Sequence, residues 1–186
     1  MGREIRRVPW NWEHPKKEVP NYRTGRMEES FQPLYNHPFE EAADEWLKEF
    51  HAWESGKDND CDEHEAKEGH RVYYWEWNGG PPDREYHRPS WTQEEATWFQ
   101  VYETVSEGTP VTPPFATKEE LIDYLVANGD YWDQHRGDGG WSRENAEKFV
   151  GTGFAVSMVV HRTGDSVEIK MPRDGQFEQQ SPPTHE

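Results

Sequence analysis

Aromatic side chains have to supply most of the hydrophobic core of this chain. Only 32% of its 186 residues are hydrophobic and 31% are charged, a composition that on its own leans toward disorder. The chain nevertheless carries ten Trp, eight Tyr and eight Phe. Each buried aromatic ring removes roughly 150 to 250 Å² from water, so a modest set of them can hold a domain together. We therefore expect a folded protein in which several tryptophans stay half exposed.

The charge balance limits the possible partners. The formal net charge is −17, which argues against direct nucleic-acid binding because phosphates are recognised mainly by Lys and Arg. The same charge favours a basic partner protein. Cys61 is the only cysteine, so no intramolecular disulfide can form, and no segment reaches the roughly 18 apolar residues of a membrane helix. We expect a cytoplasmic protein without membrane contact.

The first 38 residues contain prolines at positions 9, 15, 20, 33 and 38. This density predicts an extended arm over residues 1–38, without a helix or a central strand. Within residues 1–26, seven Lys or Arg stand against three Glu, so the arm is locally basic. We expect it to lie against the acidic remainder of the chain.

Apolar residues at helical spacing predict four helices. The first covers residues 39–54 and ends before Gly56. The second follows the capping box of Thr92 and Glu95, and the third follows that of Thr117 and Glu120 and ends at residues 128–129. A short fourth helix starts after Ser142 and is expected to end at Gly151.

The strands are expected to be few. Residues 71–77 are dense in aromatic and β-branched side chains, and segments 155–161 and 166–171 flank a turn with Gly164, which predicts a C-terminal β-hairpin. Residues 57–70 form a charge run that predicts an exposed acidic loop, and residues 172–186 predict a disordered tail. The expected fold is α+β: about four helices with a small antiparallel sheet, in a single domain over residues 39–171.

The charge run contains the residues most like metal ligands. Asp at alternate positions is how a calcium loop begins, but Glu63 and Gly69 stand where that loop needs Gly and a bidentate Glu. Thiolate and imidazole ligands suit zinc, yet a lone cysteine without a C-x-x-C pair makes such a site weak. We favour a solvated loop and no cofactor over a metal site. The candidate ligands are Asp58, Asp60, Cys61, His64 and His70.

No catalytic motif is present: G-x-S-x-G, a P-loop, H-E-x-x-H and G-x-G-x-x-G are all absent. A binding protein is therefore favoured over an enzyme, with a metal-dependent enzyme centred on residues 58–70 as an open alternative. The tryptophans, including Trp10 and Trp12, either form the core or line a stacking platform for a ring or a cation. The residues considered for stacking are Trp75, Trp77, Trp132, Trp141 and Arg136.

Three segments carry a resemblance to a known group of proteins. They read RRVPWNWEHP at residues 6–15, PSWTQEEATWFQVYETVSEGTPVTPPFATKEELIDYLVANG at 89–129 and AVSMVV at 155–160. Together they resemble a family of uncharacterised small acidic proteins encoded by tailed bacteriophages. The resemblance spans residues 3–160, with 55–83 outside it, and the chain departs from the family pattern after Gly129. It implies an accessory gene product made inside an infected bacterium, without implying a reaction or a ligand.

The leading hypothesis is therefore a phage-encoded acidic protein that inhibits or modulates a basic host protein, such as a defence or nucleic-acid-handling protein, by mimicking the charge of DNA. The alternative is a small-ligand binder or sponge for a nucleotide-like molecule at the Trp/Arg sites. The acidic surface expected to meet the partner consists of Glu40, Glu41, Asp44, Glu45, Glu49, Asp58, Asp60, Asp62 and Glu63.

Overall fold

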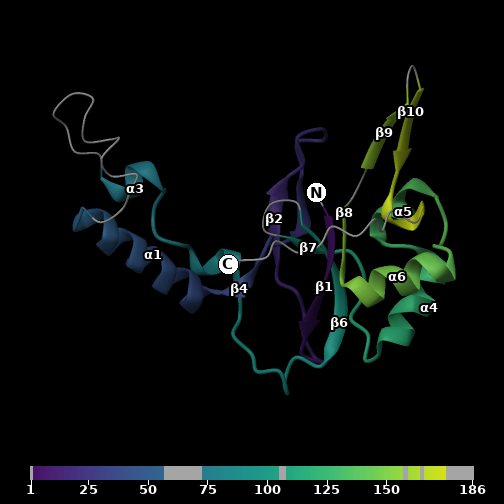
Figure 1. The fold of residues 1–186 in the computed structure, drawn as a ribbon, viewed down its shortest axis with the longest axis horizontal. Coiled ribbons are helices and arrows are strands. Elements are labelled where there is room, and N and C mark those ends of the chain that lie inside the picture. Colours follow the sequence, from purple (N-terminus) through teal and green to yellow (C-terminus); the bar gives the residue numbers. More distant parts are fainter. Residues whose placement is uncertain (1, 57–72, 105–107, 157–158, 164–165, 175–186) are drawn as a thin grey trace. The chain divides into compact units, whose positions relative to one another are not determined.

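The computed structural model describes residues 2–56, 73–104, 108–156, 159–163 and 166–174 (Figure 1). The chain divides into two compact units. Unit 1 combines residues 1–33 with residues 91–186, and unit 2 is formed by residues 34–90. These boundaries differ from the expected arm followed by one domain, because the first 33 residues belong to the same unit as the C-terminal half. The fold class is α+β, as the sequence predicts.

Unit 1 is built on an antiparallel sheet with strand order β7-β6-β1-β8. Strand β1 (Gly2–Val8) pairs with β6 (Trp98–Glu103) on one side and with β8 (Phe154–Val156) on the other, and β7 (Thr109–Pro110) borders β6. The expectation that the N-terminal arm contains no central strand is therefore wrong. Its prolines begin at Pro9, so the whole of β1 keeps the backbone N–H groups that a ladder needs.

The prediction of a helix after Thr92 is also wrong, because residues 98–103 form the interior strand β6. The capping box itself exists: Thr92 N donates to Glu95 Oε2 at 2.7 Å and Glu95 N to Thr92 Oγ1 at 3.3 Å. It closes a single turn and no helix follows. Aromatic and β-branched residues dominate Trp98–Glu103, and partners on both edges favour a strand over the helical spacing that the sequence also offers.

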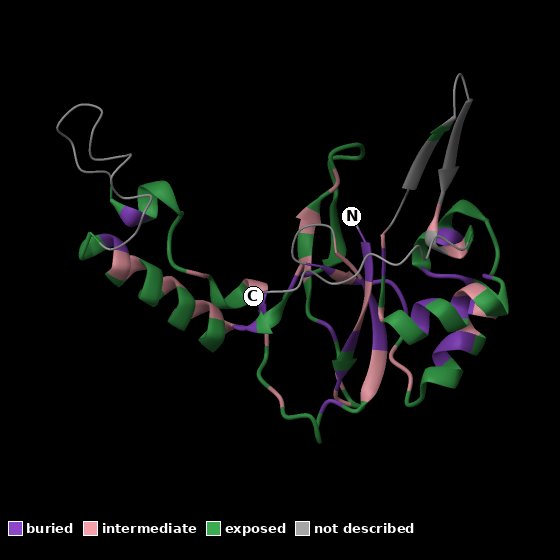
Figure 2. Cartoon of the chain, in the orientation of Figure 1, coloured by how far each residue is buried: buried purple, intermediate pink, exposed green. Residues whose placement is uncertain are grey.

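Two helices pack beside the sheet (Figure 1). Helix α4 (Lys118–Asn128) begins at the predicted capping box, where Thr117 Oγ1 accepts from Glu120 N at 3.1 Å. Helix α6 (Arg143–Thr152) begins after Ser142, as predicted, but ends at Gly153 and not at Gly151. Their inner faces form the main hydrophobic core together with the sheet (Figure 2). Its buried members are Val101, Val111, Leu121, Ile122, Leu125, Trp141, Ala146, Phe149, Val150 and Ala155.

Along the chain, a short helix that was not predicted from the sequence, α5 (Tyr131–Arg136), lies between α4 and α6. Asp130 caps it by accepting from Trp132 N at 2.8 Å and from Asp133 N at 3.0 Å. Gly137 ends it in the left-handed conformation, with φ of 73°. This helix was not predicted because it is only about one and a half turns long and is followed by the Gly-rich residues 137–140.

Two hairpins complete unit 1. Strands β2 (Lys16–Pro20) and β3 (Met27–Phe31) pair antiparallel within the expected arm. The C-terminal hairpin is confirmed as β9 (Val159–Thr163) and β10 (Ser166–Lys170). A 3₁₀ turn, η2 (Pro172–Asp174), packs on α6, so the expected tail does not begin directly at residue 172. Residues 175–186 lie outside the described residues.

Unit 2 contains the predicted first helix, α1 (Phe39–Glu54), which packs on a short helix α3 (Tyr74–Trp77). The strand expected over 71–77 is wrong where the structure describes it, because Tyr73 caps a helical turn that Asn78 ends. Strand β4 (Tyr35–Pro38), the turn η1 (Arg84–Tyr86) and the parallel partner β5 (His87–Arg88) complete the unit.

An aromatic cluster forms the core of unit 2, as the composition requires. Trp53 and Tyr74 are buried, and Trp46 and Phe50 pack on them. The Tyr74 hydroxyl donates to Glu49 at 2.5 Å, which satisfies its polar end. The expected acidic loop, 57–70, lies outside the described residues. Across the described part of both units, no helix has the length and apolar character that crossing a membrane requires.

Candidate ligand-binding cleft

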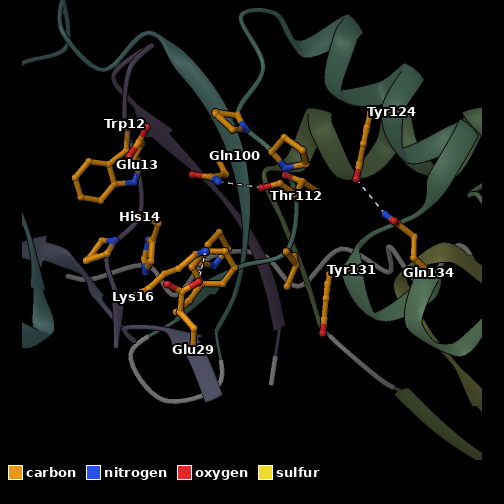
Figure 3. Close-up of a pocket in the computed structure, with 16 residues that line it drawn as sticks. Trp12, Glu13, His14, Lys16, Glu29, Gln100, Thr112, Tyr124, Tyr131 and Gln134 are labelled. Carbon is orange, nitrogen blue, oxygen red and sulfur yellow. Dashed lines mark hydrogen bonds and ion pairs between the residues drawn. The ribbon is translucent and has the colours of Figure 1, made fainter. Parts of the chain in front are cut away.

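Unit 1 contains a cleft of about 790 Å³, which is within the range of small-molecule sites. One wall comes from the segment leading into β2 and from β3, the other from α4 and α5, and the floor comes from β6 and the segment after β7 (Figure 3). The lining residues are Trp12, Glu13, His14, Pro15, Lys16, Glu29, Phe31, Gln100, Pro110, Val111, Thr112, Pro113, Pro114, Tyr124, Tyr131 and Gln134.

Aromatic faces and prolines dominate this lining. Besides the His14 imidazole, four aromatic side chains line the cleft, two on each wall: Trp12 and Phe31 on one, Tyr124 and Tyr131 on the other. Tyr131 is 54% exposed and stands at the rim, whereas Gln100 and Thr112 on the floor are buried. Such a mixture of flat apolar walls and a few buried polar groups is typical of sites that take a ring-containing ligand.

The hydroxyl of Tyr102 organises the polar groups behind the floor. Trp12 Nε1 donates to it at 3.2 Å, His14 Nδ1 lies 3.2 Å away, and Gln100 Oε1 accepts from it at 3.0 Å. Gln100 Nε2 in turn donates to the carbonyl oxygen of Thr112 at 2.9 Å. These bonds fix the segment before β2 to β6 and to the segment after β7.

Burial controls the protonation of both ionisable groups in this network. Desolvation raises the pKa of Tyr102 to about 12, so the phenol keeps its proton at physiological pH. Desolvation also lowers the pKa of His14, an effect opposed by its bond to the Gln32 carbonyl and strengthened by the nearby Arg6 cation. The Arg6 guanidinium lies 4.4 Å from the centre of the Tyr102 ring. His14 is therefore neutral near pH 7.

The charged groups of the lining disfavour anions. Among the described lining residues, Lys16 is the only Lys or Arg, and its Nζ lies 2.6 Å from Glu29 Oε2. Glu13 adds a second carboxylate to the same wall. A ligand phosphate would find no unpaired cation here, so the cleft suits an uncharged or cationic molecule.

The predicted stacking residues are distributed over both units. Trp75 and Trp77, in unit 2, are 45% and 47% exposed. Trp132 in unit 1 donates its Nε1–H to Glu103 Oε2 at 2.7 Å. Trp141 is a core residue, buried to 4% exposure, with its Nε1 2.6 Å from Asp133 Oδ2, so it offers no face for stacking. Arg136 is held by ion pairs to Asp133 and Asp138.

The predicted acidic surface is described in part. All of its residues on α1 are exposed: Glu40, Glu41, Asp44, Glu45 and Glu49. Glu40 pairs with Arg84 at 3.0 Å and Glu49 accepts from Tyr74. Asp58, Asp60, Asp62 and Glu63 lie outside the described residues.

The metal candidates Asp58, Asp60, Cys61, His64 and His70 also fall outside the described residues. Within the part of the chain that is described, no group of three or more His, Cys, Asp or Glu side chains has the arrangement of a metal site.

None of the five residues predicted for stacking lines the cleft, and the sequence alone does not reveal the cleft. Trp12 was one of the tryptophans considered, and the proline-rich segment after residue 109 is rigid, but His14, Gln100 and Tyr102 carry no motif. They meet because β1 and β6 pair across the unit, which no local pattern reveals.

Comparisons with protein-family models, curated proteins and solved structures give no significant match. The cleft is therefore interpreted from its own geometry.

Proposed function

We propose that this chain is a binding protein whose unit 1 cleft captures a small ring-containing molecule that is uncharged or cationic. The observation that carries this proposal is the convergence of Trp12, Phe31, Tyr124 and Tyr131 around a buried polar floor within one cavity. Aromatic side chains gain about 1–3 kcal/mol per stacked base, and the pairing of Lys16 with Glu29 disfavours phosphates. The ligand would resemble the base, and not the phosphate, of a nucleotide.

The test is mass spectrometry of ligands released from the purified full chain, followed by titration of the compound found. Tyr131→Ala removes an exposed ring of the cleft, and the matched control Tyr22→Ala removes a ring that is 98% exposed and does not line it. We expect Tyr131→Ala to weaken binding about tenfold and Tyr22→Ala to leave it unchanged. Equal behaviour of the two variants would contradict the proposal.

A second candidate function rests on α1. Glu41, Asp44 and Glu45 are exposed, and within the described residues they form no ion pair. Glu41 and Glu45 are four residues apart, where like charges destabilise a helix. We propose that this acidic face of α1 binds a basic host protein, in keeping with a phage accessory protein that acts in the host cytoplasm. Such an interface associates quickly and weakens as salt rises.

This second proposal is tested by capture from bacterial lysate at low and high salt. The variant Glu41→Gln/Asp44→Asn/Glu45→Gln should lose a partner that the wild type retains at low salt. The control Glu119→Gln/Glu144→Gln/Glu147→Gln neutralises exposed carboxylates on unit 1 and should retain it. If both variants bind alike, α1 is not the contact surface.

A further inference from the structure

When His14 is neutral, the polar network behind the cleft has one hydrogen-bond donor fewer than its acceptors need. His14 Nε2 lies 2.6 Å from the carbonyl oxygen of Gln32. A carbonyl oxygen only accepts, so Nε2 carries the imidazole hydrogen and Nδ1 of the neutral ring is an acceptor.

Two acceptors then compete for the single hydrogen of Tyr102. Its hydroxyl oxygen lies 3.2 Å from His14 Nδ1 and 3.0 Å from Gln100 Oε1. Trp12 Nε1 points its own hydrogen at the hydroxyl oxygen and serves neither acceptor. Among the described residues, Tyr102 is the only donor that reaches Gln100 Oε1.

Gln100 cannot relieve this competition by rotating its amide. Its Nε2 donates to the carbonyl oxygen of Thr112 at 2.9 Å, and a rotated amide would place two oxygens against each other. Gln100 is 5% exposed, and Figure 3 shows it on the floor of the cleft between the two walls. A buried acceptor without a donor is costly, and this one borders the cavity that a ligand would enter.

We propose that the molecule bound in this cleft presents an N–H or O–H donor to Gln100 Oε1, while the Tyr102 hydroxyl donates to His14. This assignment rests on the proposed binding function of the cleft and specifies the ligand class: a flat ring carrying a hydrogen-bond donor on its edge. A site built around a buried acceptor rejects a molecule of the same shape that lacks the donor.

Protonation of His14 opposes this recognition. An imidazolium donates from Nδ1 to the Tyr102 oxygen, and the hydroxyl hydrogen then turns to Gln100, so every group in the network is satisfied without a ligand. The charged and titratable groups near His14 are Arg6 from β1, Tyr102 from β6, and three residues that line the same cleft: Glu13 beside it in the chain and the Lys16–Glu29 pair on the β2–β3 hairpin. Donor recognition therefore belongs to the neutral form of His14.

The experiment uses pairs of isomers in which one methyl group lies either on a ring carbon, which leaves the N–H in place, or on the ring nitrogen, which removes it. The full chain is titrated with 1-methylindole and 3-methylindole, and with the 1-methyl and 2-methyl isomers of benzimidazole, followed by NMR at pH 7.5. At pH 7.5 we expect the N–H isomer of each pair to bind about tenfold more tightly or better. The titration is repeated at stepwise lower pH, and the preference of wild type for 3-methylindole should shrink once the pH falls below the folded-state pKa of His14, which burial lowers.

The variant Tyr102→Phe separates this proposal from a general preference for polar rings. Without the hydroxyl, no protein group among the described residues donates to Gln100 Oε1, whether His14 is neutral or protonated. The preference of this variant for 3-methylindole should therefore persist as the pH falls. Equal binding of the isomers by wild type would overturn the donor proposal and leave the cleft's binding function standing. Failure of all four compounds to bind would overturn both the donor proposal and the binding function of the cleft. A preference that changes equally with pH in wild type and in Tyr102→Phe would overturn the role of Tyr102.

Discussion

Arg3 Nε lies 2.7 Å from Asp130 Oδ2, and both residues are buried, at 6% and 2% exposure. Arg3 Nη1 also reaches Glu103 Oε1 at 3.2 Å. This pair joins β1 to the residue that caps α5, so it connects the sheet to one wall of the cleft.

We predict that Arg3→Met lowers the free energy of unfolding by about 3–5 kcal/mol, because it leaves buried carboxylates without their cation. Urea denaturation measures this loss. Arg143→Met removes an exposed partner of Glu119 and should leave the urea midpoint nearly unchanged. An equal loss of unfolding free energy in both variants would show that the Arg3 ion pair stabilises the fold no more than an exposed pair does.

Gly140 packs against the backbone of α4. A Cβ placed on Gly140 would overlap the carbonyl oxygen of Val126, whereas one on Gly137 would meet nothing within 4 Å. We expect Gly140→Ala to lower the free energy of unfolding by about 3 kcal/mol or more, since the backbone has to move. Gly137→Ala has only the strain of its positive φ, roughly 1–2 kcal/mol. Thermal denaturation of both variants distinguishes overpacking from strain.

Burial of His14 makes stability depend on pH. Its folded-state pKa is lowered by desolvation, so below about pH 6.5 the unfolded chain binds a proton that the folded chain resists. Stability should therefore fall as the pH drops from about 6.5 toward the folded-state pKa. His14→Gln should reduce this fall, measured as the difference between urea midpoints at pH 7.5 and 5. A fall of the same size in the variant would assign the effect to other groups.

His37 in unit 2 should also make the protein less stable as the pH falls. Desolvation is the main cause that lowers its pKa, and the neighbouring His87, whose ring centre is 5.0 Å away, lowers it further. Protonation of His37 is thus resisted in the folded chain. We expect His37→Gln to reduce the acid-induced loss of stability further when combined with His14→Gln. Additive effects are expected, because the partners of His14 (Tyr102 and Gln32) differ from those of His37 (Tyr35 and His87).

Neutralising the acidic face of α1 should not harm the fold. Glu41 and Glu45 repel each other at i,i+4 spacing, so Glu41→Gln/Glu45→Gln should raise the free energy of unfolding by about 0.2–0.5 kcal/mol or leave it unchanged. Circular dichroism melting checks this. A clear loss of stability would mean that these carboxylates stabilise unit 2 and are not held for a partner.

Local signals predicted the elements that depend on local chemistry. Helices α1, α4 and α6 begin close to where their apolar spacing and caps place them, because Thr117 and Ser142 bond to the turn that follows them. Strand β6 was missed because Thr92 and Glu95 offer the same local signal without a helix behind it. Its conformation is decided by β1, from the other end of unit 1's sequence.

The site was harder to predict for the same reason. His14 and Tyr102 are separated by 88 positions in the sequence, and neither belongs to a motif. Trp12 was visible as one of ten tryptophans, but composition cannot separate a cleft residue from a core residue such as Trp141. What distinguishes them is burial, which only the pairing of distant strands establishes.

The interior position of β1 determines the order in which this protein can fold during translation. Gly2–Val8 is synthesised before both of its partner strands, which begin at Trp98 and Phe154. Residues 34–90 are complete before either partner emerges, so unit 2 can fold while the first strand waits with both edges unpaired. That strand carries Arg3, Arg6 and Arg7, and charges on an unpaired edge oppose aggregation. We therefore expect the arginines of the folded sheet also to limit aggregation of the nascent chain.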